Sequence, residues 1–278
     1  MGKFDGCLLA SDIDGTLMDD GYINPKNIEK IKYFMSEGGC FSLATGRSIA
    51  AMSDILAQLK NFSPSVVANG CMIYDYAKNI TVYQKTLCKQ DYRIVKVLME
   101  SGIDIGVEIH CEEKVFSTRR NYNSDLHQKY EHFCSVDIEL EDAYNYKWNK
   151  VLYTFRNHED LLKAKALVEK EEILGCDFVE TCATIDGELQ NYYEQIPKNA
   201  NKATGLRKLC EILKIKPDKL FVIGDYYNDL KMIKMAAISA SPENAPEAIK
   251  NQTNVVVCNC KSGAVAEFID YLSNNMLG

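Results

Sequence analysis

Residues 7–17 have the sequence CLLASDIDGTL, a short apolar run followed by two aspartates with one residue between them. The apolar run predicts a buried β-strand. Residues two apart in an extended chain point to the same side, so Asp12 and Asp14 project together from the strand end. Gly15 then allows the backbone to turn away. Two carboxylates this close repel each other unless a cation or a shared proton lies between them. A loop of solvated aspartates is the competing interpretation, and distant segments decide between the two.

Composition sets broad limits on the function. The chain has 278 residues, of which 46% are hydrophobic and 26% charged, as in an ordinary globular protein of one or two domains. A net charge of −7 without a basic run argues against nucleic acid as a partner. No apolar stretch is long enough to cross a membrane, and the first residues lack the apolar region of a signal peptide. Eleven scattered cysteines predict reduced thiols and a cytoplasmic protein.

Strands and helices alternate on the C-terminal side of the opening strand. Asn24 and Pro25 predict a helix start, and apolar residues follow at helical spacing. A second buried strand at 40–44 precedes a helix capped by Ser48, and a third strand is expected at 65–68. This order is typical of a parallel sheet covered by helices.

The pattern changes between residues 85 and 190. Strands there alternate in polarity, which predicts a separate α+β domain inserted into the first, with residues 119–147 polar and irregular. The parallel pattern resumes in residues 191–278. The predicted organisation is therefore an α/β parallel-sheet core built from residues 1–84 and 191–278, with an insert at 85–190.

Polar groups lie at the ends of the predicted parallel strands, where open α/β sheets bind their ligands. Each alone is a common loop or surface feature, but four in chain order argue against chance. They are the pair Asp12 and Asp14, the pair Thr45 and Gly46, Lys202 at a helix start, and Asp225 with Asn228 and Asp229.

The chemistry of these groups converges on phosphate. Carboxylates bind Mg²⁺, which commonly recruits phosphate oxygens. A lysine supplies a point charge for a phosphoryl group, and hydroxyl and amide groups at helix starts add hydrogen-bond donors. An aspartate can also act as a nucleophile and form an aspartyl-phosphate.

These motifs resemble the four motifs of the haloacid dehalogenase superfamily. The matching segments are DIDGTL at 12–17, TGR at 45–47, Lys202, and GDYYND at 224–229. The place and size of the insert resemble the Cof-type phosphatases with a C2 cap. The resemblance implies a Rossmann-like core with an inserted α+β cap domain. It further implies a magnesium-dependent phosphatase of small phosphorylated metabolites, such as sugar phosphates, that forms an aspartyl-phosphate intermediate.

The resemblance also implies roles for the matching carboxylates. Asp12 attacks phosphorus, while Asp14 protonates the leaving oxygen and then takes a proton from water. Asp12, the backbone carbonyl of Asp14 and Asp225 hold Mg²⁺. Asp229 supports the metal site without being one of these ligands.

Further residues are expected to contact the phosphoryl group or the substrate. The resemblance implies phosphate binding by Thr45, Gly46, Lys202 and Asn228. Two other positions have two interpretations each. Asn69 and Gly70 form either a hairpin turn or, as the resemblance implies, part of the substrate site. Arg47 either contacts substrate or pairs with a surface carboxylate.

Three other functions compete with hydrolysis. A phosphomutase of the same superfamily would need an acyl phosphate that survives water. A catalytically silent regulator that binds a phosphometabolite would not need all four motifs. A phospho-receiver domain carries its phosphoacceptor on the third strand, where this chain has Asn69. The expected partner is a small phosphate ester, and the chain is expected to be a monomer or a homodimer.

Overall fold

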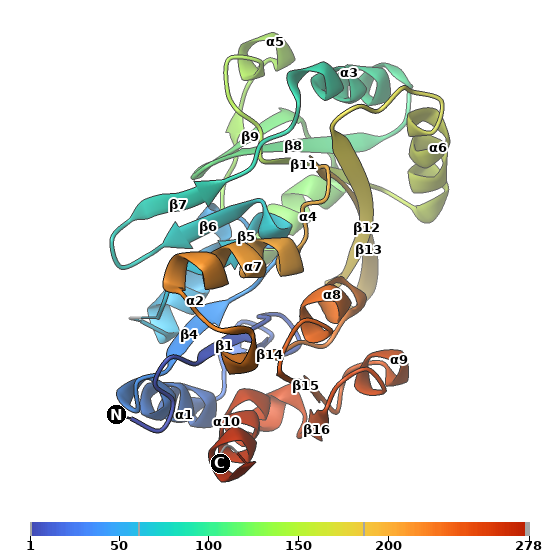
Figure 1. Cartoon of the computed structure of the whole chain (residues 1–278). Helices are drawn as coiled ribbons and strands as arrows, with labels where there is room; N and C mark the ends of the chain where they lie inside the picture. Colours follow the sequence, from blue (N-terminus) through green and yellow to red (C-terminus); the bar gives the residue numbers. More distant parts are fainter. Residues whose placement is uncertain (1, 61, 186, 276–278) are drawn as a thin grey trace. The chain divides into compact units, whose positions relative to one another are not determined.

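The computed structural model describes residues 2–60, 62–185 and 187–275. The chain forms two compact units (Figure 1). The first contains Met1–Gly46, Asp54–Tyr83 and Asn201–Gly278, and the second contains Arg47–Ser53 and Gln84–Ala200. Each unit has its own sheet and hydrophobic core. The predicted fold class, a parallel-sheet α/β core with an inserted α+β domain, is confirmed.

The first unit is built on a parallel five-stranded sheet. Its strands, in order across the sheet, are β16 (Val255–Val257), β15 (Ile238–Pro242), β14 (Leu220–Ile223), β1 (Leu8–Ser11) and β4 (Cys40–Leu43). All four residues of β1 are buried, because β1 lies between β14 and β4 and both faces of the sheet are covered. The carboxyl ends of β1, β14 and β4 therefore open at one edge, and Asp12, Asp225 and Thr45 follow them.

Helices cover both faces of this sheet. α1 packs beside α10, whereas α7 and α8 contribute to the apolar cluster that contains Leu8 and Ala10 of β1 (Figure 1). The predicted cap of α1 is confirmed, since the Asn24 side chain accepts a hydrogen bond from the Lys26 amide and Pro25 opens the helix. The helical segments of this unit are α1 (Pro25–Ser36), α2 (Ser53–Gln58), η2 (Ala68–Gly70), α7 (Lys202–Leu213), η4 (Pro217–Lys219), η5 (Tyr227–Asp229), α8 (Leu230–Ile233), α9 (Glu247–Lys250), η6 (Cys260–Ser262) and α10 (Ala264–Asn275).

The third predicted strand departs from the simple parallel pattern. β5 (Ser65–Val67) meets the parallel sheet through an isolated bridge between Val66 and Ala44 and not through a regular ladder. It pairs antiparallel with β6 (Met72–Asp75), and β7 (Ile80–Gln84) completes a three-stranded sheet. The connection between β5 and β6 contains Ala68, Asn69 and Gly70, all with positive φ. The hairpin interpretation of this Asn-Gly pair is confirmed. A small ribbon of β2 (Met18–Asp19) and β3 (Tyr22–Ile23) follows the opening strand.

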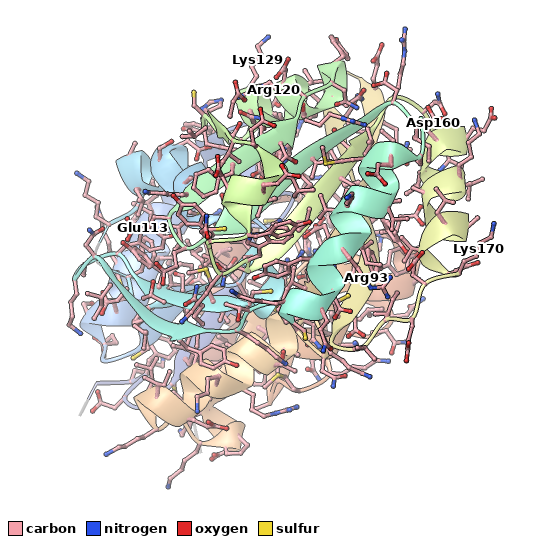
Figure 2. All side chains as sticks on the ribbon, turned by 90° about the horizontal axis from the view of Figure 1, so that it is seen from above. Arg93, Glu113, Arg120, Lys129, Asp160 and Lys170 are labelled. Atoms are coloured by element: carbon pink, nitrogen blue, oxygen red, sulfur yellow. The ribbon has the colours of Figure 1, made fainter. Side chains whose placement is uncertain are left out.

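The second unit contains a six-stranded sheet with helices (Figure 1). Its strands, in order, are β10 (Val136–Asp137), β9 (Lys114–Arg119), β8 (Ile105–Cys111), β11 (Lys150–Phe155), β13 (Glu188–Pro197) and β12 (Cys176–Ile185). Its helical segments are η1 (Ile49–Met52), η3 (Lys89–Tyr92), α3 (Arg93–Glu100), α4 (Tyr122–Tyr130), α5 (Leu140–Ala143) and α6 (His158–Val168). α3 and α6 share one apolar cluster with β8 and β11. Charged side chains such as Asp160 and Lys170 lie near the two ends of α6 (Figure 2).

Two expectations for local structure are wrong. Residues 119–147 are not irregular, since they contain helix α4. This helix begins with a capping box in which Asn121 accepts a hydrogen bond from the Ser124 amide. The polar sequence of α4 gives little apolar periodicity, so the helix depends on this cap and on its packing against β8 and β11. Ser48 does not cap the following helix, since its side chain makes no such hydrogen bond.

Two further expectations concern reduced cysteines and the absence of a membrane-spanning segment. All ten cysteines whose side chains are described are free thiols, as expected for reduced residues. Within the described ranges, every helix is too short or too polar to cross a membrane.

A buried ionic cluster lies within the second unit. The His127 ring contacts the Glu108 carboxylate at 2.9 Å through Nδ1 and the Glu131 carboxylate at 3.5 Å through Nε2. Burial alone would lower the pKa of His127, but the two carboxylates raise it to about 10. Burial opposes ionisation of Glu108, yet His127 and His110 lower its pKa to about 2. His127 is therefore held as a cation between two carboxylates.

This cluster predicts a pH-dependent stability. Because the pKa of His127 is raised from 6.5 to about 10 on folding, its contribution is complete below pH 6.5 and is lost as pH rises toward 10. The pKa of Glu108 is lowered from 4.5, so its contribution is complete above pH 4.5 and is lost on acidification. We expect His127→Gln to lower Tm most near pH 6, with the difference from wild type shrinking toward pH 10.

Thermal unfolding of both proteins across this range checks the prediction. His158→Gln is the matched control, because His158 is exposed at the start of α6. A difference between His127→Gln and wild type that stays constant from pH 6 to pH 10 would contradict the cationic state of His127.

Candidate active site

The Lys202 side chain connects two of the predicted carboxylates. Lys202 is the first residue of α7, which is capped by a reciprocal hydrogen-bond pair between Asn201 and Thr204. Its ammonium donates to Asp12 Oδ1 at 2.6 Å and to Asp229 Oδ1 at 2.7 Å. Lys202 and Asp229 are 2% and 0% exposed, so neither charge is solvated by bulk water. The end of β1, the start of α7 and the loop after β14 therefore meet at one ammonium group.

Asp229 is fully engaged by this arrangement. Its second oxygen, Oδ2, accepts hydrogen bonds from the Asp225 and Tyr226 amides, each at 3.1 Å. These contacts fold residues 225–229 into a tight turn over the end of β14. Asp229 thus orients Lys202 and the loop, which leaves little freedom for it to bind a metal directly.

Asp225 lies against the turn that follows β1. The Thr16 hydroxyl donates to Asp225 Oδ1 at 2.9 Å. Gly15 has a φ of +81°, and a Cβ atom there would lie 2.5 Å from Asp225 Oδ2. The turn can approach the carboxylate this closely only because residue 15 is glycine. The sequence predicted no role for Thr16. A hydroxyl directly after the Asp-x-Asp-Gly turn is the signal that could have identified Thr16 as a site residue.

The donor set fits a hard divalent cation such as Mg²⁺. Carboxylate oxygens of Asp12, Asp225 and Asp229 lie within 4.8 Å of one another. Three carboxylates face one ammonium, which leaves excess negative charge in a buried place. The side-chain oxygen Oδ1 of Asn228 is also buried without a hydrogen-bond partner at the same loop. Oxygen ligands and excess negative charge are what Mg²⁺ requires.

The excess charge shifts the pKa values of two carboxyl groups. Burial, together with the Asp229 charge, raises the pKa of Asp12 well above its usual range, although Lys202 opposes the shift. Burial and Asp229 raise the pKa of Asp225 to about 6. Burial alone would lower the pKa of Lys202, but Asp12 and Asp229 raise it, so the lysine stays protonated. A bound cation would relieve the repulsion that these shifts report.

The structure also brings the Thr45–Gly46 loop after β4 beside the β5–β6 connection. The Asn69 amide donates to the Thr45 carbonyl at 3.0 Å, and a Cβ on Gly46 would lie 3.2 Å from Asn69 Oδ1. A Cβ on Gly70 would lie 2.0 Å from the Asn201 carbonyl, next to the start of α7. The Asn69–Gly70 turn therefore packs both on Gly46 and on the segment that carries Lys202.

Two predicted site residues, Asp14 and Arg47, make contacts other than those described above. Asp14 is exposed, and its backbone bridges to Met18 within the turn. Arg47 belongs to the second unit, where its guanidinium donates to the Ala51 carbonyl at 3.1 Å. Burial alone would raise the pKa of Glu131, but His127 and, to a smaller extent, the Arg47 charge lower it. The substrate contact expected of Arg47 and its pairing with a surface carboxylate both stay predictions.

Comparisons with known proteins agree on one family. The family described as haloacid dehalogenase-like hydrolase matches residues 9–269. A 5-amino-6-(5-phospho-D-ribitylamino)uracil phosphatase of Bacillus subtilis strain 168 is 26% identical over 291 positions, covering 95% of this chain and 97% of that protein. A pyridoxal phosphate phosphatase of Escherichia coli K12 is 24% identical over 279 positions, covering 94% and 97%.

Solved structures show the same fold. A haloacid dehalogenase subclass IIB sugar phosphatase superposes with a TM-score of 0.80 at 18% identity, covering 96% of this chain and 98% of that one. A haloacid dehalogenase-like hydrolase from Bacteroides thetaiotaomicron gives a TM-score of 0.79 at 18% identity, covering 96% and 99%.

Replacing Lys202 tests the charge arrangement. We expect Lys202→Met to destabilise the protein by about 3–5 kcal/mol, because breaking a buried ion pair leaves carboxylates without compensation. Lys208→Met is the control on the same helix, since the Lys208 side chain is 43% exposed and pairs with Glu211; we expect no measurable change there. Urea unfolding compares the two variants with wild type. Equal stability of all three proteins would show that Lys202 does not bridge the carboxylates.

Proposed function

The chain belongs to the haloacid dehalogenase-like hydrolases and is a phosphatase, and we propose that it hydrolyses phosphate esters of small metabolites with Mg²⁺ as its cofactor. The observation that carries this proposal is the buried contact of Lys202 with Asp12 and Asp229 beside Asp225. One cation among three carboxylates is a poor arrangement for stability alone, but it suits a centre that receives both a metal ion and an anionic ester.

Asp12 is the proposed nucleophile. Its backbone amide donates to the Ile223 carbonyl at 3.0 Å, which holds it between the ends of β1 and β14. Its carboxylate attacks phosphorus, the bond from phosphorus to the leaving oxygen breaks, and an aspartyl-phosphate remains on Asp12. Water then attacks phosphorus, which releases inorganic phosphate and restores the carboxylate.

Asp14 is the proposed acid and base. It lies two residues beyond Asp12 and is exposed, so it can exchange protons with an ester or with water. It gives its proton to the leaving oxygen in the first step. It takes a proton from the attacking water in the second step, so that the proton count balances over one cycle.

The remaining groups bind the phosphoryl oxygens and balance charge. We assign phosphate binding to Lys202, to the Thr45–Gly46 loop and to Asn228, whose side-chain Nδ2 would donate to a phosphoryl oxygen. Asp12, the Asp14 carbonyl and Asp225 would hold Mg²⁺. When bound, Mg²⁺ offsets the repulsion between the carboxylates and the ester and draws charge from a phosphoryl oxygen.

The proposal covers the class of small phosphate esters and names no single organic group. The two curated relatives described above are named for a ribitylaminouracil phosphate and for pyridoxal phosphate, which differ in ring and polyol. Sugar phosphates and related compounds are therefore the first esters to test. The free cysteines support a reducing compartment such as the cytoplasm.

Phosphate release from a panel of sugar, polyol, pyridoxal and aryl phosphates tests this function. We expect hydrolysis in Mg²⁺, none in excess chelator, and recovery when Mg²⁺ is returned.

Asp12→Asn should have no measurable turnover while its Tm stays close to that of wild type. Hydrolysis in excess chelator, or turnover by Asp12→Asn, would contradict the mechanism. A product phosphorylated at a new position would instead show a phosphomutase.

A further inference from the structure

We infer that Asn244 and Asn27 are positioning residues, whose side-chain amides fasten the turn carrying Asp14 to the C-terminal segment 258–266. Neither residue belongs to the four motifs. Each amide donates to a carbonyl of residues 13–19 and accepts from a backbone amide of the C-terminal segment. The inference about the turn stands on these contacts, and only its effect on turnover rests on the proposed function.

Asn244 lies in the loop between β15 and α9. Its Nδ2 donates to the Gly15 carbonyl at 2.8 Å. Its Oδ1 accepts from the Cys260 amide at 2.9 Å, just beyond β16. One exposed side chain therefore joins three loops at the carboxyl edge of the sheet. The amide of an asparagine supplies both the donor and the acceptor for these two bonds.

Asn27 makes the same kind of bridge from inside the protein. It is 0% exposed in the first turns of α1. Its Nδ2 donates to the Leu17 carbonyl at 3.2 Å, and its Oδ1 accepts from the Ala266 amide at 2.9 Å. Two asparagines from different elements thus bind carbonyls two residues apart in the turn.

The turn requires fastening because of its own sequence. Gly15 adopts a φ of +81° and has no side chain that could pack, so this position costs more conformational freedom on folding than any other residue type would. Within the described part of the chain, the inner side of the turn is held by Thr16 on Asp225. The two asparagine amides add hydrogen bonds to the Gly15 and Leu17 carbonyls. Asp14 precedes Gly15 directly, so a displacement of the Gly15 peptide moves both the carboxylate and the backbone carbonyl of Asp14.

Lys261 adds an ion pair to the turn and a hydrogen bond to Asn24, which lies beyond the turn. Lys261 pairs with Asp19 at 3.2 Å, and its carbonyl accepts from Asn24 Nδ2 at 2.7 Å. The C-terminal segment therefore reaches the turn from three residues, from Cys260 and Ala266 through the asparagine amides and from Lys261 directly. This explains how residues more than 200 positions away can affect the proposed acid–base residue.

The test removes one hydrogen bond while keeping the other. In the double variant Asn244→Asp with Glu243→Gln, the carboxylate still accepts from the Cys260 amide but cannot donate to Gly15. The exposed Glu243 is neutralised so that the net charge is unchanged. Asn244→Ala, which loses both bonds, is the second variant. Asn254→Ala is the control, because Asn254 is also exposed and accepts two hydrogen bonds from Ser239 without touching the turn.

Hydrogen–deuterium exchange of residues 13–19 in the metal-free proteins is the first readout. We expect exchange about tenfold faster in both Asn244 variants, the effect of losing about one hydrogen bond, and no change in Asn254→Ala. The second readout is steady-state kinetics, where kcat should fall about tenfold and KM should change little.

Each contrary result overturns the inference. Exchange at 13–19 that matches wild type in the Asn244 variants would show that the amide does not hold the turn. Equally fast exchange in Asn254→Ala would show a general loosening of the loops. Faster exchange with an unchanged kcat would remove the positioning role. Because exchange needs no substrate, it decides the structural inference even if the wild-type protein hydrolyses no ester.

Discussion

A single ammonium group holds the candidate site together. Lys202 lies in a buried position between Asp12 and Asp229, at 2.6 and 2.7 Å, and these carboxylates come from loops more than 200 residues apart in the sequence. Without the ammonium the two loops would repel each other. With it the site still carries excess negative charge, since Asp225 lies within the same cluster. Structure and proposed chemistry therefore depend on the same contact.

Much of this arrangement could be predicted from the sequence, because its signals are local. Asp12 follows a buried strand, Lys202 opens a capped helix, and Asp225 and Asp229 follow another buried strand. The topology of a parallel sheet then brings these places together, and β1 lies between β14 and β4 as that topology requires. The fold class was predictable for the same reason, since the apolar strands and amphipathic helices alternate along the chain.

Other features depend on contacts that no local pattern reports. Helix α4 was missed because its sequence is polar and its start is set by the Asn121 cap. The Asn69–Gly70 pair did predict the antiparallel turn of β5 into β6, but not that this turn packs on Gly46 and on the Asn201 carbonyl. Asn244 binds backbone atoms of two distant loops, and the residues around Asn244 in the sequence do not identify these partners.

The central claim is that Asp12 becomes phosphorylated during turnover, and trapping the intermediate tests it most directly. In Asp14→Asn the first step should proceed with an aryl phosphate, whose leaving group needs little protonation, whereas the second step lacks its base. Such catalysis contributes about 10²–10⁴-fold, so the intermediate should accumulate. The account predicts a burst of about one equivalent of aryl alcohol and, after acid quenching and digestion, a phosphoryl group on the peptide containing Asp12. A phosphoryl group on another residue, or the absence of any burst and label, would contradict it.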